Sequence, residues 1–328
     1  MNLNFFKNKN LLLTGGTGSF GKAFISHMLK NKVPLKKIIV YSRDELKQFE
    51  MSKIYNDKKY ENIRYFIGDV RDKERLKLAL NNVDIVVHAA ALKHVPIAEY
   101  NPFEFIKTNV LGAQNLIECC LGGSVKKVIA LSTDKASSPV NLYGATKLCS
   151  DKLFIAANNI KGKQDIKFSI VRYGNVMGSR GSVLQTFFEQ EKNGVFNITH
   201  NNMTRFNINM QEAIDFVIYS LINLKGGEIF VPKIPSFYIT DLAKAINAKC
   251  KIKIIGIRPG EKIHEEMISF YDSSNTVDLK KCYAILNQNN FKFYKDYKFL
   301  ESNFSYRSDN NKYFLNINQL RKIIKNIS

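Results

Sequence analysis

Residues 14–21 read TGGTGSFG, and this stretch indicates the fold class. It follows the apolar run 11–13 and precedes a helical pattern that begins near Gly21. In a G-x-x-G-x-x-G turn, the first glycine allows a tight turn, the second lets the backbone approach a pyrophosphate, and the third lets the helix pack on the sheet. An ordinary glycine-rich turn is the alternative, but the strand–helix junction favours dinucleotide binding. We expect the cofactor to contact Gly15, Thr17, Gly18, Ser19, Phe20 and Gly21.

The chain around this turn alternates strand and helix patterns. Apolar strand patterns at 38–41, 63–67, 83–88, 128–132 and 168–172 are separated by helical patterns, among them a long one at 102–120 and one at 143–157. Continuous apolar strands joined by helices predict a parallel sheet covered on both faces. We therefore expect an α/β, Rossmann-type doubly wound domain over residues 1–175, with part of 200–232 interleaved.

We expect the remaining residues, 176–328, to form mainly a smaller interleaved α/β lobe that binds the substrate. Helical patterns cover 182–193, 210–223 and about 317–327, and a polar stretch, ITHNNMTRFNIN, separates the first two. Residues 256–262, GIRPGEK, are expected to form a loop that opens a helix. The last ~45 residues suggest short polar-aromatic strands before the final helix.

Composition narrows the class of protein. The 328 residues carry a formal net charge of +20, but the basic residues are dispersed and match no nucleic-acid-binding motif. We expect no nucleic-acid partner; a general attraction for anionic ligands or a solvated basic surface accounts for the charge. No apolar run approaches the ~20 residues of a membrane span. Five cysteines without metal or disulfide spacing predict reduced thiols, no metal site and a cytoplasmic location.

The residues after the second and third strands indicate which cofactor is bound. Ser42 and Arg43 favour the 2′-phosphate of NADP, with Lys47 as support, while Asp44 leaves NAD open. Asp69, followed by Val70, is placed near the adenine amine, and a helix cap is the alternative role for its carboxylate. Ala89 and Ala90, after the fourth strand, complete this expected site.

Residues 131–147, LSTDKASSPVNLYGATK, contain a pattern typical of hydride-transfer chemistry. Tyr143 and Lys147 share one helical face. A phenol is a poor base at neutral pH, but a nearby ammonium and the positive nicotinamide ring favour its phenolate. Tyr143 could then deprotonate a hydroxyl while hydride leaves the same carbon. A surface Tyr–Lys pair is the alternative.

With the segments TGGTGSFGK, AAALKHVP (89–96) and RYGNVMGSRGSV (172–183), this pattern resembles the extended short-chain dehydrogenase/reductase superfamily. Within it the chain is similar to nucleotide-sugar 4,6-dehydratases, and most to the inverting UDP-N-acetylglucosamine branch that opens pseudaminic acid synthesis. One departure is that Thr133-Asp134-Lys135 stands where the wider group has Thr-Asp-Glu, and the usual insertion before the tyrosine is missing. Larger membrane-bound relatives share the Asp-Lys pair but usually replace the tyrosine, which this chain keeps.

The resemblance implies a role for each residue. Tyr143 deprotonates O4, Thr133 hydrogen-bonds O4, and Lys147 holds the nicotinamide ribose. Lys135 removes the C5 hydrogen and Asp134, protonated, delivers a proton to the departing C6 hydroxyl. A free lysine is neutral in only about 1 molecule in 10³ at pH 7, so NADP⁺ and Lys147 are expected to lower the pKa of Lys135. A lysine that only anchors the substrate is the alternative, and the pKa of Asp134 must be raised.

The resemblance also implies the ligand contacts. Asn109 would face the cofactor ribose, and His94 would be structural. The substrate is expected to be UDP-N-acetylglucosamine, with Arg205 and Arg258 on its pyrophosphate. The expected substrate-binding residues are Lys93, Asn175, Val183, Thr204, Arg205, Arg258 and Glu261. Relatives form hexamers, so a homohexamer is expected, with a dimer as alternative. The rival functions are a nucleotide-sugar 4-epimerase, which would not need Asp134-Lys135, and a non-catalytic NADP-binding regulator.

Overall fold

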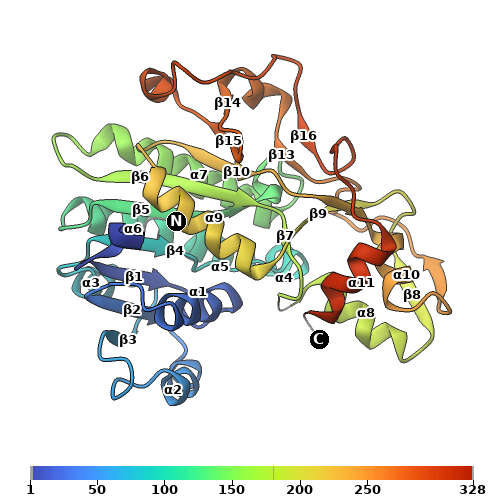
Figure 1. Cartoon of the computed structure of the whole chain (residues 1–328), viewed down its shortest axis with the longest axis horizontal. Coiled ribbons are helices and arrows are strands. Elements are labelled where there is room, and N and C mark those ends of the chain that lie inside the picture. Colours follow the sequence, from blue (N-terminus) through green and yellow to red (C-terminus); the bar gives the residue numbers. More distant parts are fainter. Residues whose placement is uncertain (1–2, 180, 327–328) are drawn as a thin grey trace.

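The computed structural model describes residues 3–179 and 181–326, and within them the chain forms a nine-stranded sheet (Figure 1). The strand order is β3-β2-β1-β4-β5-β6-β10-β15-β14. The strands are β1 (Asn10–Thr14), β2 (Lys37–Ser42), β3 (Ile63–Ile67), β4 (Ile85–His88), β5 (Lys127–Thr133), β6 (Lys167–Tyr173), β10 (Ile229–Pro232), β14 (Thr276–Asp278) and β15 (Cys282–Ile285). From β3 to β10 neighbouring strands are parallel, whereas β15 and β14 add antiparallel pairs. The 3-2-1-4-5-6 order confirms the doubly wound Rossmann fold class.

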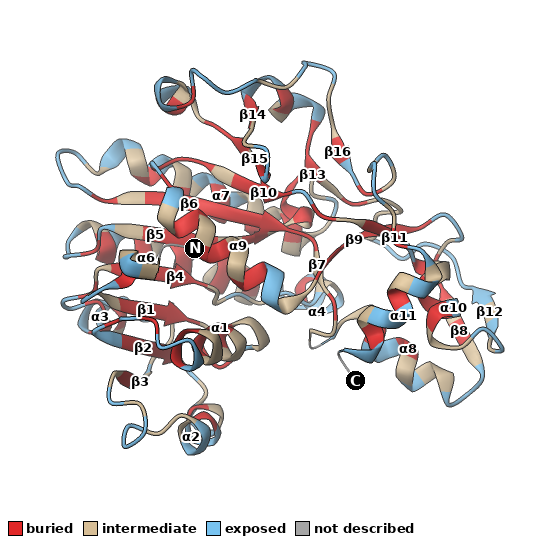
Figure 2. Ribbon diagram, viewed as in Figure 1, coloured by how far each residue is buried: buried red, intermediate tan, exposed pale blue. Residues whose placement is uncertain are grey.

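Helices cover both faces of this sheet. On one face lie α1 (Ser19–Lys30), α2 (Glu45–Ile54) and α9 (Met210–Asn223), and on the other α3 (Lys73–Ala79), α6 (Gly112–Leu121) and α7 (Leu142–Ile160). The side chains of β1 alternate between the two faces of the sheet. Leu11 and Leu13 pack in the core beneath α1, α2 and α9, whereas Leu12 packs in the core beneath α3, α6 and α7. Figure 2 shows the strands between these layers as mostly buried.

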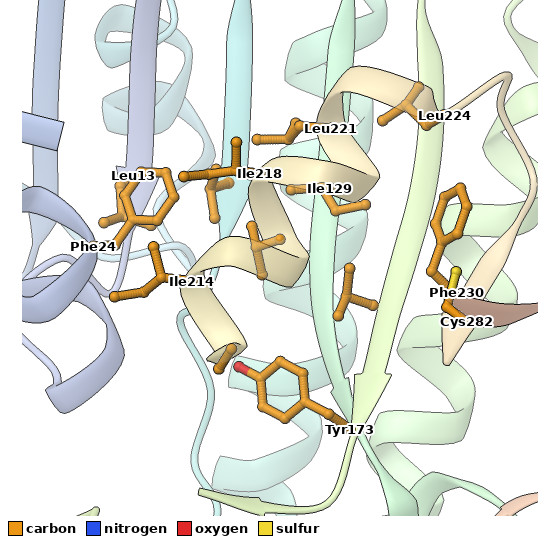
Figure 3. Close-up of a cluster of buried hydrophobic side chains, with 14 of the residues drawn as sticks. Leu13, Phe24, Ile129, Tyr173, Ile214, Ile218, Leu221, Leu224, Phe230 and Cys282 are labelled. Carbon is orange, nitrogen blue, oxygen red and sulfur yellow. The ribbon is translucent and has the colours of Figure 1, made fainter. Parts of the chain in front are cut away.

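Helix α9 returns the chain from the second lobe to the sheet. Its residues Ile214, Ile218 and Leu221 pack over Leu13 of β1 and Ile129 of β5 (Figure 3). A capping box at Asn209 and Glu212 fixes where the helix begins. The main sheet and its covering helices therefore include residues well beyond 175, namely α9, β10 and the pair β14–β15.

The predicted long helix at 102–120 is divided in three. The short helix α4 (Val95–Tyr100) precedes α5 (Pro102–Phe105), which continues into a π-helical turn at Ile106–Leu111 and then into α6. Single π turns occur frequently at functional sites. Here the turn carries Asn109, whose buried side chain reaches the residues after β4.

The second lobe has its own apolar core. It contains α8 (Val183–Glu191), α10 (Ile239–Ile246), α11 (Ile317–Lys325) and the parallel pair β8 (Val195–Ile198) and β12 (Lys251–Ile254). Phe187, Phe196, Leu242 and Leu320 are buried between them. Figure 1 shows this lobe to the right of the sheet.

Short strands connect the two parts. The chain forms β7 (Asn175–Val176), β9 (Thr204–Ile208) and β11 (Ser236–Tyr238) in one small sheet, and β13 (Glu266–Ile268) pairs with β16 (Tyr306–Arg307). Short 3-10 helices occur at Leu3–Phe6, Asp134–Ala136, Phe270–Asn275 and Gln288–Phe293. No helix in the described residues is long and apolar enough to span a membrane.

One local prediction is wrong. No helix follows GIRPGEK: residues 255–265 stay irregular and lead into β13, because Gly260 has a left-handed φ of 74° and Asn141 Nδ2 binds its carbonyl at 2.8 Å. The polar stretch 198–209 contains the fully buried strand β9.

Candidate active site

A cavity of about 1130 Å³ opens at the carboxyl ends of β1, β4, β5 and β6, where it meets the second lobe. Doubly wound folds bind ligands at this edge of the sheet. Its volume exceeds the ~300–1,000 Å³ of a pocket for one drug-sized molecule, so it can hold a dinucleotide and a second ligand. Among the described residues, its lining includes six basic and three acidic side chains, which favours anionic ligands: Lys93, Lys135, Lys147, Arg205, Arg258, Lys262, Glu99, Glu261 and Glu265.

The glycine turn after β1 has the geometry that a dinucleotide needs. Gly15 has a φ of 67°, and a Cβ there would meet the Ala90 nitrogen at 2.8 Å and the Ala89 oxygen at 2.9 Å. A Cβ on Gly21 would lie 2.5 Å from the Gly15 oxygen, so α1 packs directly on the turn. Ser19 and Phe20 at the start of α1 line the cavity, where unpaired N–H groups of a helix can receive phosphate. The residues present therefore fit a dinucleotide.

The residues expected to select the cofactor lie outside the cavity lining, and their side chains form hydrogen bonds or ion pairs with neighbouring residues. Asp44 caps α2 through Lys47 N at 3.0 Å and pairs with the Lys47 ammonium, so its carboxylate is committed to the helix. Arg43 is exposed, and its guanidinium lies 3.6 Å from Asp69 Oδ2. Ser42 Oγ contacts Thr17 Oγ1 at 2.7 Å.

Asp69 does not cap a helix, so that alternative is wrong. The cap of α3 is Asp72, which accepts from Arg75 N at 2.9 Å. Asp69 instead binds Arg71 through backbone and guanidinium, and these contacts lower its pKa although burial opposes them. Its neighbour Val70 is buried against Gly112 of α6, so its side chain packs in the core.

The residues from 133 to 147 form one cluster, as the sequence predicts. Thr133 ends β5, Asp134 and Lys135 form a 3-10 turn, and α7 carries Tyr143 and Lys147. A Cβ on Gly144 would lie 2.3 Å from the Lys135 carbonyl oxygen, so only glycine lets α7 pack this closely. Thr133, Lys135, Tyr143 and Lys147 all line the cavity.

Both α7 residues have shifted pKa values; Lys147 is buried and Tyr143 is half-buried. Burial raises the pKa of Tyr143 to about 12, against the opposing effects of the Lys135 ammonium and a hydrogen bond with Thr133. Burial lowers the pKa of Lys147, which Asp151 partly offsets. Tyr143 therefore needs additional positive charge in the cavity before its phenolate is populated.

Lys135, whose side chain is 24% exposed, pairs with two buried carboxylates, Asp134 and Glu265. Lys135 Nζ donates to Asp134 Oδ1 at 3.1 Å, Glu265 Oε1 at 3.0 Å and Asn175 Oδ1 at 3.4 Å, so each of its three N–H donors faces an acceptor. The expected depression of the Lys135 pKa is wrong: burial does lower it, but the two carboxylates outweigh burial and raise it. Burial raises the pKa of Asp134, as an acid role requires.

A second buried network holds α7 against the sheet. Asp151, two turns after Tyr143, accepts from Ser132 Oγ at 2.7 Å and from the Arg172 guanidinium at 3.2 Å. Arg172 also donates to the Met267 carbonyl at 3.1 Å, which connects β6 with β13. This network fixes the orientation of Tyr143 and Lys147 over β5.

Most of the expected substrate residues line the cavity. Those that do are Lys93, Asn175, Val183, Arg205, Arg258 and Glu261. Burial and the neighbouring Lys135 lower the pKa of Lys93. Glu261 has a buried Oε2 without a hydrogen-bond partner among the described residues, which suits a ligand donor. Arg205 uses its guanidinium on the carbonyls of Thr204, Ile263 and Lys262, so Arg258 is the freer phosphate ligand.

Two further residues expected to contact ligands, Asn109 and Thr204, do not line the cavity. Asn109 accepts from Leu92 N at 2.8 Å and donates to Leu92 O and Thr146 Oγ1, so it clamps the segment after β4 instead of lining the cavity. Thr204 is fully buried and bonds His264 and Ser308 at 2.8 and 2.7 Å. Through these hydrogen bonds, both residues hold segments that border the cavity.

The sequence reasoning missed the loop that covers the cluster. Lys262 Nζ donates to the Ser137 carbonyl at 2.7 Å, and Ser138 Oγ donates to Glu266 Oε2 at 2.7 Å. Together with Asn141–Gly260 and Lys135–Glu265, these contacts join residues 260–266 to 135–141. The adjacent acids Glu265 and Glu266, in an otherwise basic chain, were the signal that could have revealed this.

Comparison with known proteins agrees with the fold. The pattern of the polysaccharide biosynthesis protein family matches residues 11–287. The chain belongs to this family. It is 54% identical to a UDP-N-acetylglucosamine 4,6-dehydratase (inverting) from Campylobacter jejuni, over 97% of this chain and 98% of that protein. A UDP-glucose 4-epimerase from Rickettsia conorii is 42% identical over 85% of this chain and 83% of that protein. The solved structure of Pen from Bacillus thuringiensis superposes with a TM-score of 0.90 at 39% identity, covering 98% of each chain.

Proposed function

We propose that this protein is an NADP-dependent UDP-N-acetylglucosamine 4,6-dehydratase that inverts C5. The product would be UDP-2-acetamido-2,6-dideoxy-β-L-arabino-hex-4-ulose. The observation that carries the proposal is the ion pair between the buried Asp134 and Lys135, which lines the same cavity as Tyr143. A tyrosine and lysine suffice to oxidise C4, whereas an adjacent acid and base are what elimination of water requires. The Campylobacter relative and its printed name support the same assignment.

The reaction assigns one task to each side chain. A bound nicotinamide dinucleotide would accept hydride from C4 and return it to C6. The Tyr143 phenolate takes the O4 proton, and Thr133 hydrogen-bonds that oxygen. Lys135 removes the C5 hydrogen, made acidic by the ketone, and Asp134 protonates the C6 hydroxyl as water leaves. C5 is then reprotonated from the opposite face, so the net change is loss of one water molecule.

The residues of this chain also support the choice of NADP. Arg43 is exposed at the end of β2 and can approach a 2′-phosphate, while Asp44 is occupied with α2. Gly15, Gly18, Ser19, Phe20 and Gly21 would hold the pyrophosphate. Lys147 would hold the nicotinamide ribose.

The second ligand would lie between β6 and the second lobe. Arg258 would bind the UDP pyrophosphate as a planar fork, and Glu261 would accept from the uridine ribose or the acetamido group. Lys93 and Asn175 would contact the sugar near the reacting carbons. We further propose a cytoplasmic homo-oligomer whose product enters pseudaminic acid synthesis and flagellin glycosylation.

A nucleotide-sugar 4-epimerase is the second candidate, favoured by the Rickettsia relative. An epimerase needs Tyr143 and Lys147 but leaves Asp134 and Lys135 without a task.

The test is incubation of the purified protein with UDP-N-acetylglucosamine and NADP⁺ in D2O, followed by NMR and mass spectrometry. Loss of water, deuterium at C5 and the L-arabino 4-keto sugar are expected. A D-xylo initial product would contradict inversion, and a C4 epimer without water loss would establish the epimerase instead.

A further inference from the structure

We propose that Glu265 is a positioning residue of the elimination step: it holds the Lys135 side chain towards the sugar and stabilises the ammonium that forms when Lys135 removes the C5 hydrogen. The inference rests on the proposed function and adds to it a residue 130 positions away from Lys135. Glu265 immediately precedes β13 and lines the cavity.

The backbone of Glu265 is held firmly. Its N–H donates to Ser308 Oγ at 2.9 Å, and its carbonyl accepts from Ser308 N at 2.8 Å. Ser308 Oγ also contacts the buried Thr204 at 2.7 Å. Since these bonds leave the Glu265 backbone little freedom, the carboxylate is presented to Lys135 from a fixed direction.

The carboxylate is almost fully buried, with 2% of the side chain exposed. Burying a charge is costly unless it is paired. Oε1 lies 3.0 Å from Lys135 Nζ and 3.7 Å from Arg205 Nε, and these cations hold its pKa below the usual range although burial opposes them. Oε2 has no hydrogen-bond partner among the described residues. Buried polar atoms without a partner are uncommon, and a catalytic role is one reason for them.

Asp134 alone does not stabilise Lys135 throughout the proposed elimination. While Lys135 removes the C5 hydrogen, Asp134 still carries the proton that it will give to the departing hydroxyl, so at that step it has no charge with which to stabilise Lys135. In the described residues, Glu265 is the other carboxylate in contact with the amine. A buried carboxylate does the same for histidine in Ser-His-Asp triads, where it orients the base and stabilises its cation.

Glu265→Gln tests the inference, because it keeps the shape and removes the charge. Tyr143 does not depend on this carboxylate, so C4 oxidation should proceed and reduced cofactor should accumulate. Deuterium incorporation at C5 and water loss should fall by about 10²-fold or more, with KM nearly unchanged. The active Asp134–Lys135 pair keeps one shared proton, and loss of this proton at high pH sets the alkaline limb of the pH–rate profile. This limb should move to lower pH, since the carboxylate no longer raises the pKa of Lys135.

Two variants make the result specific. Glu118→Gln is the matched control: this carboxylate on α6 pairs with Lys73, outside the cavity lining, and should leave every readout unchanged. Glu265→Asp keeps the charge on a shorter side chain and should recover part of the C5 exchange. If Glu265→Gln does not fold, as judged by its thermal melting, Glu265→Asp should show the same selective loss in milder form.

The outcomes separate the two proposals. Wild-type protein that dehydrates its substrate, with Glu265→Gln equal to it, would overturn the role of Glu265 alone. Equal loss of C4 oxidation and C5 exchange in folded Glu265→Gln would show a merely structural role. Wild-type protein that releases no water would overturn the proposed function, and the role of Glu265 with it.

Discussion

At the scale of single residues, the site depends on a carboxyl group that is unfavourable to ionise. Asp134 has no exposed surface, and its Oδ2 has no hydrogen-bond partner among the described residues. Burial raises its pKa in the folded protein. Catalytic acids commonly reach this state at some cost to stability.

Asp134→Asn should therefore change the dependence of stability on pH. The folded protein keeps a proton on Asp134 at pH values where the unfolded chain, with a pKa of about 4, has lost it. The contribution of Asp134 to the free energy of unfolding is therefore lost as the pH rises from about 4 towards the higher folded-state pKa. Asp134→Asn should flatten the melting temperature over this range and preserve or raise it at pH 7, while abolishing water loss.

The control for this measurement is Asp44→Asn. The Lys47 contacts lower the pKa of Asp44, so its contribution has the opposite sign: it is present above about pH 4 and lost as the pH falls through the folded-state pKa. Asp44→Asn should lower the melting temperature slightly or leave it unchanged. A slope for Asp134→Asn equal to that of the wild type would contradict the raised pKa of Asp134.

At the same scale, sequence reasoning identified residues whose partners are close in the chain. Tyr143 and Lys147 follow from helical spacing alone. Glu265 contacts Lys135 across 130 residues, and no local pattern encodes that meeting. Thr204 and Asn109 are polar and near functional residues, yet their hydrogen bonds go to Ser308, His264, Leu92 and Thr146. Polarity indicates a partner but does not indicate which one.

At the scale of elements, α7 and the 3-10 turn before it must approach closely. Gly144→Ala should lower both stability and activity, because its Cβ would overlap the Lys135 carbonyl at 2.3 Å. The better helix propensity of alanine, about 1 kcal/mol, should be outweighed by overpacking of about 1–3 kcal/mol and by displacement of Lys135.

Chemical denaturation and turnover would measure these two effects. Gly122→Ala is the matched control at the end of α6, because the atom nearest to its added Cβ is the Glu118 oxygen at 3.8 Å. This variant should be neutral or slightly stabilised and fully active. A Gly144→Ala protein as stable and active as the wild type would mean that α7 shifts freely.

Elements were predictable from sequence where they are long and regular. The six strands from β1 to β6 and the helices α1, α7 and α9 agree closely with their apolar patterns. The pair β14–β15 was not predicted, because three- and four-residue antiparallel strands leave little pattern. The helix expected after GIRPGEK fails because Gly260 adopts a left-handed backbone and the loop bonds to Asn141 and Ser137 instead.

At the scale of the whole molecule, charge and cavity act together. The formal net charge is +20, and basic side chains predominate in the cavity lining. A doubly anionic nucleotide sugar should be attracted over a distance that salt screens to about 8–10 Å at physiological ionic strength.

Raising the NaCl concentration should therefore increase KM for the nucleotide sugar and leave kcat nearly constant. Steady-state kinetics at several salt concentrations would measure this, and Arg258→Gln should show a higher KM with a shallower salt dependence. A KM that does not change with salt would mean that the basic surface has no part in substrate capture.

The 3.1 Å contact between Lys135 Nζ and Asp134 Oδ1 makes the two side chains a single titrating unit. The ion pair and its neutral tautomer hold the same number of protons, and one short proton transfer interconverts them. The neutral tautomer provides the free amine and the protonated carboxyl that elimination needs, and elimination itself regenerates the ion pair. Proton transfer in the dehydration step is thus confined to the pair and the substrate. The step draws no proton from bulk water, and the net charge of the cluster is the same before and after water leaves.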